Sequence, residues 1–236
     1  MEEGVNPVLS FRKVIEAARR EGRRWLDTLE SLTLVEAYGI PVAPYDSASN
    51  LDELLDSARR LGYPIVVKPV ASSMLHKTEL GAVKLNLKSD EEAEEAFKDL
   101  RKSLEAKGIP FEKVLVQRML SPGLEVAVGG LYDEQFAQVV MLGFGGILIE
   151  VYRDVVFRVA PISKAEAYEM MRELKGYPII KGYRGTGPYD EEALADILTK
   201  VSGLLMENPE IKELDLNPII LYGRGGYAAD SRILLK

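Results

Sequence analysis

Residues 63–81 read YPIVVKPVASSMLHKTELG, and this stretch decides how the rest of the chain is interpreted. It opens with three β-branched apolar residues at 65–67, a pattern that predicts a buried strand. Lys68 ends that run, and a lysine is costly to bury among aliphatic side chains unless an anion pairs with it. The small polar loop that follows holds His76, the only histidine of the chain. We therefore expect Lys68 and His76 to serve the same anion.

The composition is that of an ordinary globular protein. The chain has 236 residues, of which 47% are hydrophobic and 28% charged, which is enough for one large domain or for two lobes that share a cleft. No apolar run approaches the roughly 18 residues that a membrane span needs, and two glutamates directly after Met1 have the wrong charge for a signal peptide. We expect a cytoplasmic protein.

The charge and the residue types exclude several classes of function. A net charge of −7 argues against a nucleic-acid partner or an anionic membrane. The absence of cysteine excludes disulfides, thiolate metal sites and a cysteine nucleophile, and a single histidine excludes a multi-histidine metal site within the chain. A divalent ion would have to be held by oxygen ligands, which favours magnesium or calcium.

Helices and strands alternate along the first half of the chain, and strands dominate the second half. Residues 1–25 form an amphipathic helix whose basic face is either solvated, which we prefer, or a subunit contact. Further helices are expected over residues 28–38, 51–61, 90–106, 164–174 and 191–206, and strands over 65–67, 82–87, 114–119, 125–132, 135–142, 147–151, 155–159, 211–216, 219–222 and 226–230. This is an α+β pattern. We divide it into an N-terminal extension (1–25), a first lobe (26–112) and a second lobe (113–236).

His76 has a bland and a chemical interpretation. A lone histidine in a polar loop is more often a solvent-exposed residue without a catalytic role than a catalyst. Two apolar residues directly before it are unusual in such a loop, as though its tip docks somewhere. A neutral imidazole is a good nucleophile toward phosphorus, and Glu79 is near enough to orient the ring. Lys68 could equally extend to water or neutralise nucleotide phosphates.

The glycine motif at residues 143–146, GFGG, lies between two expected strands and is therefore not a dinucleotide-binding fingerprint. It is either a bulge in the sheet or a place where backbone N–H groups approach an anion closely.

The C-terminal stretch carries the most chemistry. Glu213, Asp215 and Asn217 alternate along one strand, so their side chains point to one face. Asp230 follows after a hairpin. These oxygen-bearing side chains either form the exposed face of an edge strand or hold a magnesium ion that binds phosphate oxygens. Arg158 and Arg184 could each hold phosphate through the guanidinium, or form surface salt bridges.

Together these motifs resemble the ATP-grasp fold, and more closely the β subunit of ADP-forming acetyl-CoA (acyl-CoA) synthetases. The resemblance covers nearly all of the chain beyond the first 25 residues. The stretches that carry it are GYPIVVKPVASSMLHKTELGAV (62–83), VQRML (116–120), GLEVAVGG (123–130), VVMLGFGGILIEVYRDVVFRVAPI (139–162), KGYRG (181–185), ELDLNPII (213–220) and AAD (228–230).

The resemblance implies a nucleotide cleft between two lobes, each a mixed or antiparallel sheet with helices. The implied reaction makes ATP, acid and coenzyme A from acyl-CoA, ADP and phosphate. In the family, an α subunit that binds coenzyme A phosphorylates its own histidine. A second histidine, matching His76, then takes the phosphoryl group to ADP on a loop that should move. The implied partner is therefore an α subunit in an α2β2 assembly, and the implied cofactors are ATP or ADP and Mg²⁺.

The resemblance also assigns roles to residues of this chain. The implied catalytic residues are His76, Glu79, Arg158 and Arg184. Nucleotide contacts fall on the phosphate lysine, the 116–119 hinge and the glycine motif, namely on Lys68, Val70, Ser72, Gln117, Arg118, Met119, Glu125, Gly143, Gly145 and Gly146. Metal ligands fall on Asn217 and Asp230, with Asp215 nearby. Two alternatives remain: an ATP-grasp carboxylate ligase without a phosphohistidine, and a nucleotide-binding regulatory subunit without catalysis.

Overall fold

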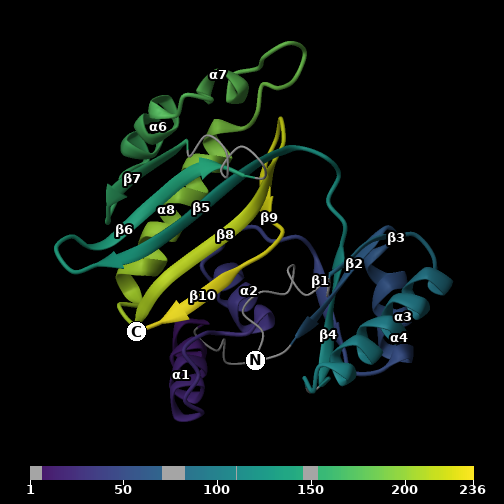
Figure 1. The fold of residues 1–236 in the computed structure, drawn as a ribbon. Helices are drawn as coiled ribbons and strands as arrows, with labels where there is room; N and C mark the ends of the chain where they lie inside the picture. The colour runs from purple at the N-terminus through teal and green to yellow at the C-terminus, as the bar shows by residue number, and fades with distance from the viewer. Residues whose placement is uncertain (1–6, 71–82, 110, 146–153) are drawn as a thin grey trace, which may run out of the picture. The chain divides into compact units, whose positions relative to one another are not determined.

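The computed structural model describes residues 7–70, 83–109, 111–145 and 154–236 (Figure 1). The chain divides into two compact units. Unit 1 comprises Met1–Leu26, Glu30–Val42 and Pro122–Lys236, and unit 2 comprises Asp27–Leu29 and Ala43–Ser121. Each unit has its own antiparallel sheet and its own hydrophobic core, as an α+β protein requires. Within the described residues no helix is long and apolar enough to cross a membrane.

The sheet of unit 1 is built around one long strand, β8 (Ile211–Leu221). On one side β8 pairs with β5 (Leu124–Asp133), which is followed in the sheet by β6 (Ala137–Phe144) and β7 (Val155–Val159). On its other side β8 pairs first with β9 (Gly226–Ala228) and then with β10 (Arg232–Leu235), one after the other along its length. All of these pairings are antiparallel.

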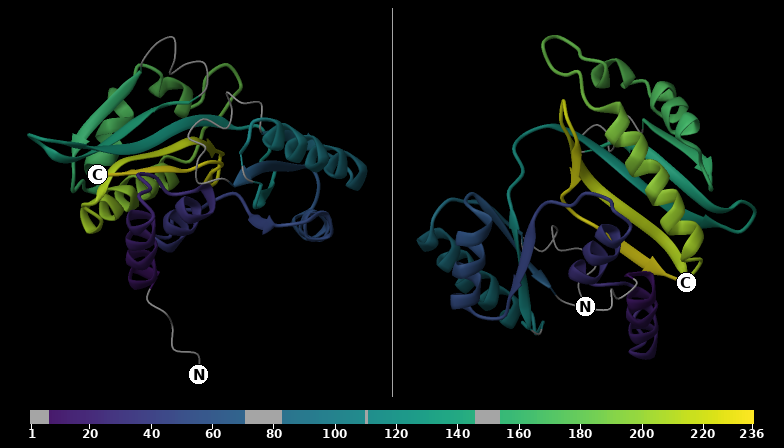
Figure 2. Two further views of the ribbon diagram at one scale, coloured as in Figure 1. Left: turned by 60° about the horizontal axis from the view of Figure 1, so that its bottom comes forward. Right: turned by 180° about the vertical axis from the view of Figure 1, so that it is seen from behind.

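One face of this sheet is covered by helices. α8 (Glu191–Glu207) runs across it, as the view from behind in Figure 2 shows, and α6 (Lys164–Glu173) and the short α7 (Tyr177–Ile180) lie beside it. α8 begins at Asp190, whose side chain accepts the Ala193 N–H, and α6 begins with a capping box formed by Ser163 and Glu166. Alternate residues of β5, β6 and β8 complete the core against the apolar side of α8.

Two N-terminal helices belong to the same unit. α1 (Pro7–Arg20) and α2 (Thr28–Ala37) lie on the β10 side of the sheet. The segment between them is tied to β10, because Leu26 N–H donates to the Ile233 carbonyl (3.0 Å) and Leu235 N–H to the Arg24 carbonyl. Ile15 and Ala18 of α1 are buried in the core of unit 1. The apolar side of the amphipathic helix expected over residues 1–25 therefore packs on the domain.

Unit 2 contains a four-stranded sheet in the order β1 (Tyr45–Ala48), β4 (Lys113–Arg118), β2 (Ile65–Val70) and β3 (Lys84–Leu87). α3 (Leu51–Leu61) and α4 (Asp90–Ala106) cover one face (Figure 1). Ile65 and Val67 point toward these helices, into a core that includes Leu54 and Leu100. By alternation Val66, Lys68 and Val70 lie on the other face.

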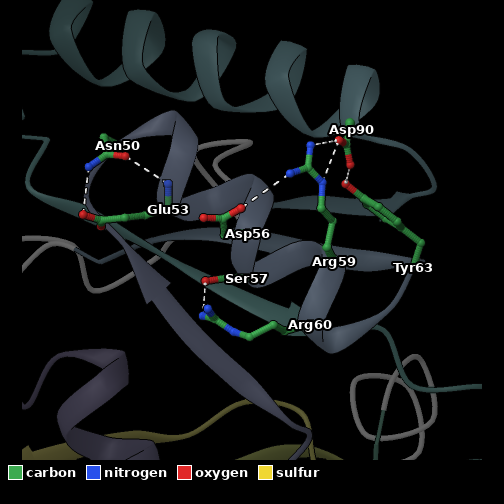
Figure 3. Close-up of polar contacts among 8 residues, drawn as sticks. All are labelled: Asn50, Glu53, Asp56, Ser57, Arg59, Arg60, Tyr63 and Asp90. Atoms are coloured by element: carbon green, nitrogen blue, oxygen red, sulfur yellow. Dashed lines mark hydrogen bonds and ion pairs between the residues drawn. The ribbon is translucent and has the colours of Figure 1, made fainter.

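Polar contacts fix α3 at both of its ends (Figure 3). Asn50 caps its N-terminus by accepting the Glu53 N–H (3.0 Å). At its other end Arg59 Nε donates to the Asp90 carboxylate (3.0 Å), which also accepts the Tyr63 hydroxyl (2.8 Å). These two donors hold the pKa of Asp90 below its ordinary value. The first turn of α4 is thereby joined to the end of α3 and to the residues that lead into β2.

The structure differs from the sequence-based expectation in several elements. Residues 211–216 and 219–222 form the single strand β8, and β10 was not expected at all. Gly143 and Phe144 continue β6, so the glycine motif does not interrupt the sheet there. β4 pairs with β1 and β2 and so belongs to unit 2, whereas we divided the lobes at residue 113. The strand expected over 147–151 lies outside the described residues.

Candidate functional site

The two faces of the unit 1 sheet differ in character. Gly130 and Leu214 are paired and point toward α8, where a Cβ added at Gly130 would lie 2.2 Å from a Leu205 methyl carbon. We call the opposite side the open face. Gly129 and Asp215, the next pair along, lie on that open face.

Three oxygen-bearing side chains gather on the open face. In β8, Leu214 and Leu216 are buried in the core while Asp215 and Asn217 are half-buried on the other side. The predicted placement of Asp215 and Asn217 on one face is therefore confirmed by the burial pattern. We call Asp215, Asn217 and Asp230 the oxygen cluster.

The strand register brings Asp230 to this cluster. Ile219 pairs with Ala228 and Asp215 pairs with Arg232, and both pairs obey one continuous register. Asp230 lies between β9 and β10, and we infer from this register that it stands opposite Asn217, where directly opposite residues of antiparallel strands present their side chains on the same face. The effect of the Asp230 carboxylate on the pKa of Asp215 agrees with this placement.

A β-bulge lies at the same point. Val126 of β5 pairs with Ile219 and Val128 pairs with Leu216, so Asn217 and Pro218 together face one residue of β5. A bulge bends the strand and re-aims its side chains, and bulges are frequent beside active sites.

The charges in this region act on Asp215. Burial raises the pKa of the Asp215 carboxyl, and the neighbouring carboxylates Asp230 and Glu213 raise it further. The Arg232 guanidinium lowers it. Two carboxylates close enough to disfavour each other's ionisation are stabilised when a cation binds between them.

The chemistry of the oxygen cluster fits a magnesium ion. Mg²⁺ prefers oxygen ligands and is commonly held by one or two carboxylates together with substrate phosphates. The cluster offers two carboxylates and one amide oxygen. No group of three or more His, Cys, Asp or Glu residues suited to a metal occurs in the described part of the chain, so protein ligands alone would not fill the coordination sphere. This is the pattern expected when phosphate oxygens complete the site.

Beside the oxygen cluster the open face carries few side chains. Glu125, Ala127 and Gly129 of β5 lie on it, and Gly143 of β6 pairs with Ala127. Gly145 follows β6 and donates its N–H to the Glu125 carbonyl (2.8 Å). A Cβ at Gly145 would lie 3.0 Å from Glu125 Cβ, so this position disfavours a side chain. Ala127, Gly129, Gly143 and Gly145 carry a methyl group or no side chain, and all four are buried.

Unit 2 contains a buried cation and a buried amide. Lys68 is 7% exposed and Gln117 is 2% exposed, and both lie on the sheet face away from α3 and α4. We expected Lys68 at the end of its strand, but it lies within β2. Val70 ends the strand and lies on the same face as Lys68. Gln117 Nε2 donates to the Ala43 carbonyl at 3.5 Å.

The expected hinge at residues 116–119 is the end of β4 and the start of the next segment. Arg118 N–H donates to the Pro44 carbonyl (2.8 Å) and Met119 N–H to the Pro64 carbonyl (3.0 Å). Both N–H groups are thus used within the protein. A nucleotide base that contacts this segment would have to bind the backbone carbonyl groups of the segment or the Gln117 side chain.

Arg158 lies on the other face of the sheet from the oxygen cluster. Arg158 on β7 pairs with Val140, which points toward α8, and its guanidinium forms an ion pair with Glu173 of α6. That hydrogen bond raises the pKa of Arg158. The surface salt bridge that we held open for Arg158 is therefore present, on the covered face of the sheet.

Arg184 is exposed at the tip of a two-residue turn. Tyr183 and Thr186 exchange backbone hydrogen bonds, and Arg184 has a φ of 50°. Its guanidinium lies 5.4 Å from the centre of the Tyr183 ring.

Four of the expected site residues, namely Ser72, His76, Glu79 and Gly146, lie outside the described residues. Sequence reasoning in turn missed Gly129 and Arg232, which the register places next to Asp215. The spacing of Asp230 and Arg232 repeats that of Asp215 and Asn217, and this alternation could have indicated a second strand on the same face.

Comparison with known proteins identifies the family of the chain. The family model described as ATP-grasp domain matches residues 17–235. The β subunit of ADP-forming acetate–CoA ligase I from Pyrococcus furiosus is 44% identical over 230 residues, which cover 97% of this chain and 99% of that one. ADP-forming acetate–CoA ligase I of Archaeoglobus fulgidus is 43% identical over 226 residues, which cover 94% of this chain but 33% of that longer protein.

A solved structure agrees over the same length. Acetyl-coenzyme A synthetase 1 of Ca. Korarchaeum cryptofilum superposes with a TM-score of 0.85 at 38% identity, covering 96% of this chain and 100% of the matched chain. It contains coenzyme A and Mg-AMPPCP, with its phosphohistidine segment pointing towards the nucleotide-binding site.

The family match and the agreement of the fold therefore define an ATP-grasp protein. Within that class, the chain belongs to the family of β subunits of ADP-forming acetate–CoA ligases.

Proposed function

We propose that this chain carries a phosphoryl group on His76 between an α subunit and ADP. The observation that best supports this role is the collection of Glu125, Asp215, Asn217 and Asp230 on one sheet face. This arrangement suits a magnesium nucleotide whose phosphates need positioning and charge neutralisation.

The relay consists of two transfers that balance in atoms and charge. In the first, an imidazole nitrogen of His76 attacks the phosphorus of the α subunit's phosphohistidine, so one P–N bond forms as another breaks. In the second, a terminal phosphate oxygen of ADP attacks the same phosphorus, the His76 P–N bond breaks, and ATP leaves. Glu79 orients the imidazole in both steps.

The described residues have roles around this transfer. Lys68 neutralises phosphate charge, while Gln117, Arg118 and Met119 contact the base through backbone carbonyl and side-chain groups. Asp215, Asn217 and Asp230 hold Mg²⁺, which when bound withdraws charge from the phosphate oxygens. The remaining proposed contacts are with Val70, Ser72, Glu125, Gly143, Gly145, Gly146, Arg158 and Arg184.

The proposed partner is an α subunit that binds coenzyme A. The Archaeoglobus protein joins a matching segment to twice as much additional chain, and the Pyrococcus protein of this length is named as a β subunit. We propose that a separate chain supplies the missing part here, in an α2β2 assembly. Light scattering of the co-purified complex measures that stoichiometry, and a mass other than that of two copies of each chain contradicts it.

Labelling tests the relay directly. Incubation of the chain with Mg²⁺ and ATP labelled in the γ-phosphate should give an acid-labile, base-stable label that maps to His76. His76→Ala should lose the label and, with the α subunit present, ATP formation, while nucleotide binding is kept.

Two results would contradict the relay. ATP formation retained by His76→Ala would point to a carboxylate ligase that needs no phosphohistidine. An α subunit that is fully active alone would make this chain a regulatory subunit.

A further inference from the structure

Arg232 is a cation on the open face for which no role was expected from the sequence. Its pairing partner in the sheet is Asp215, so it projects on the same side as the oxygen cluster. Asp230 stands two residues before it along the same chain. Asp215, Asn217, Asp230 and Arg232 thus form a two-by-two block, with three oxygen donors and one guanidinium.

We propose that Arg232 binds the nucleotide phosphates beyond the α-phosphate, beside the metal that the oxygen cluster holds. This assignment rests on the proposed function, because it needs a magnesium nucleotide on the open face. It adds a phosphate contact beyond those that the sequence motifs and the resemblance to the family imply.

The guanidinium is available for a ligand. Arg232 is exposed, and among the described residues no carboxylate lies within ion-pair distance of it. Its charge still reaches the cluster, since it lowers the pKa of Asp215. Arg232 therefore lies near the acids without being paired to one of them.

Phosphate is the ligand chemistry that this position favours. A guanidinium presents a planar fork of donors that matches two phosphate oxygens at once. An arginine next to a magnesium site is a recurring solution for phosphoryl transfer, since cation and guanidinium divide the charge of the phosphate oxygens between them. A bare carboxylate cluster would instead repel a polyphosphate.

A purely structural role makes the opposite prediction. If Arg232 only balances the charge of Asp215, its removal leaves the acids more negative and strengthens the binding of Mg²⁺ alone without weakening nucleotide binding. If Arg232 holds phosphate, its removal weakens Mg·ATP binding. The two roles thus differ in the sign of a measurable change.

The experiment is calorimetric titration of the full chain and its Arg232→Gln variant with Mg·ATP, AMP and Mg²⁺ alone. We expect Arg232→Gln to bind Mg·ATP about 10- to 100-fold more weakly, the range for loss of a hydrogen bond to a charged group. AMP affinity should be unchanged. Arg232→Lys, which keeps the charge but not the fork, should fall between the two.

Arg224→Gln is the matched control, because Arg224 is an exposed arginine in the turn between β8 and β9. It should bind Mg·ATP like the unmodified chain. Unchanged Mg·ATP affinity in Arg232→Gln, or an equal loss for AMP, would overturn the assignment. The binding assay does not involve His76. A failure of the His76 relay and a failure of the Arg232 assignment are therefore detected in separate experiments.

Discussion

Asp215 of β8 pairs with Arg232 of β10, and the same register, extended across residues 229–231 between β9 and β10, places Asp230 opposite Asn217. Thirteen positions separate them in the sequence. The β8–β9 hairpin brings them together at the point where a bulge bends β8 away from its regular pairing with β5. The candidate metal site is therefore a property of the strand pairing, and the residue types alone do not create it.

Asp230→Asn should weaken Mg·ADP binding at least about 10-fold, since it removes one of two carboxylates from a site that prefers charged oxygen ligands. Titration calorimetry measures the change. Glu134→Gln serves as control, because Glu134 is an exposed carboxylate in the turn between β5 and β6. Equal affinities for Mg·ADP in Asp230→Asn and in the control would argue against a metal at this cluster.

Lys68→Met should weaken ADP binding about 10-fold or more and affect AMP less, because a charge-assisted contact to the outer phosphate is lost. Lys84→Met on β3 is the control, where the lysine forms an ion pair with Asp99 at 3.0 Å. A Lys68→Met chain that binds ADP normally contradicts the phosphate role.

Gly145→Ala should lower the free energy of unfolding by about 1–3 kcal/mol, because the added methyl group meets Glu125 Cβ at 3.0 Å and the Glu125 carbonyl carbon at 3.1 Å. Backbone atoms cannot move aside as a flexible side chain can. Gly203→Ala is the matched control: nothing lies within 4 Å of its added Cβ, and alanine within α8 should stabilise by about 0.5–1 kcal/mol. Urea unfolding of both variants gives the comparison. Equal stability of the two would show that the Gly145 contact relaxes freely.

Asp190→Ala should destabilise the chain by about 1–3 kcal/mol, since the carboxylate both caps α8 and accepts the Gly225 N–H at 2.7 Å. Asp190→Asn keeps a capping oxygen and should lose less.

The same residue predicts a pH dependence. The Gly225 and Ala193 N–H groups hold the pKa of Asp190 below its ordinary value of 3.8. A folded-state pKa below the unfolded one contributes stability that is complete above about pH 3.9 and is lost as the pH falls through the folded value. The stability gap between the parent chain and Asp190→Asn should therefore narrow in acid. A gap that stays constant from pH 7 to pH 3 would contradict the role of the ionised carboxylate.

Much of the site could be predicted from the local pattern. Asp215 and Asn217 alternate with buried leucines, and a period of two places both on one face wherever the strand lies. The capping residues Asn50, Ser163 and Asp190 follow from side chains that satisfy free N–H groups at helix starts. The anion contact expected for the glycine motif stays a prediction, and the Gly145 N–H donates to the Glu125 carbonyl (2.8 Å).

Other features needed the fold. Arg158 was a phosphate candidate by residue type, but its strand turns it toward α6, where Glu173 pairs with it. Arg232 carried no signal as a single residue, because its partner Asp215 belongs to another strand.

Residue type and spacing over a few positions were enough to predict the buried lysine of β2 and the oxygen-bearing strand, and the resemblance to a known family indicated the class of protein. The folded chain was needed to see that β8 is one strand with a bulge, that its register places Asp230 opposite Asn217, and that Arg232 pairs with Asp215. Register and face are set by hydrogen bonding between strands and by the burial of one side against α8, and neither is encoded in any single segment.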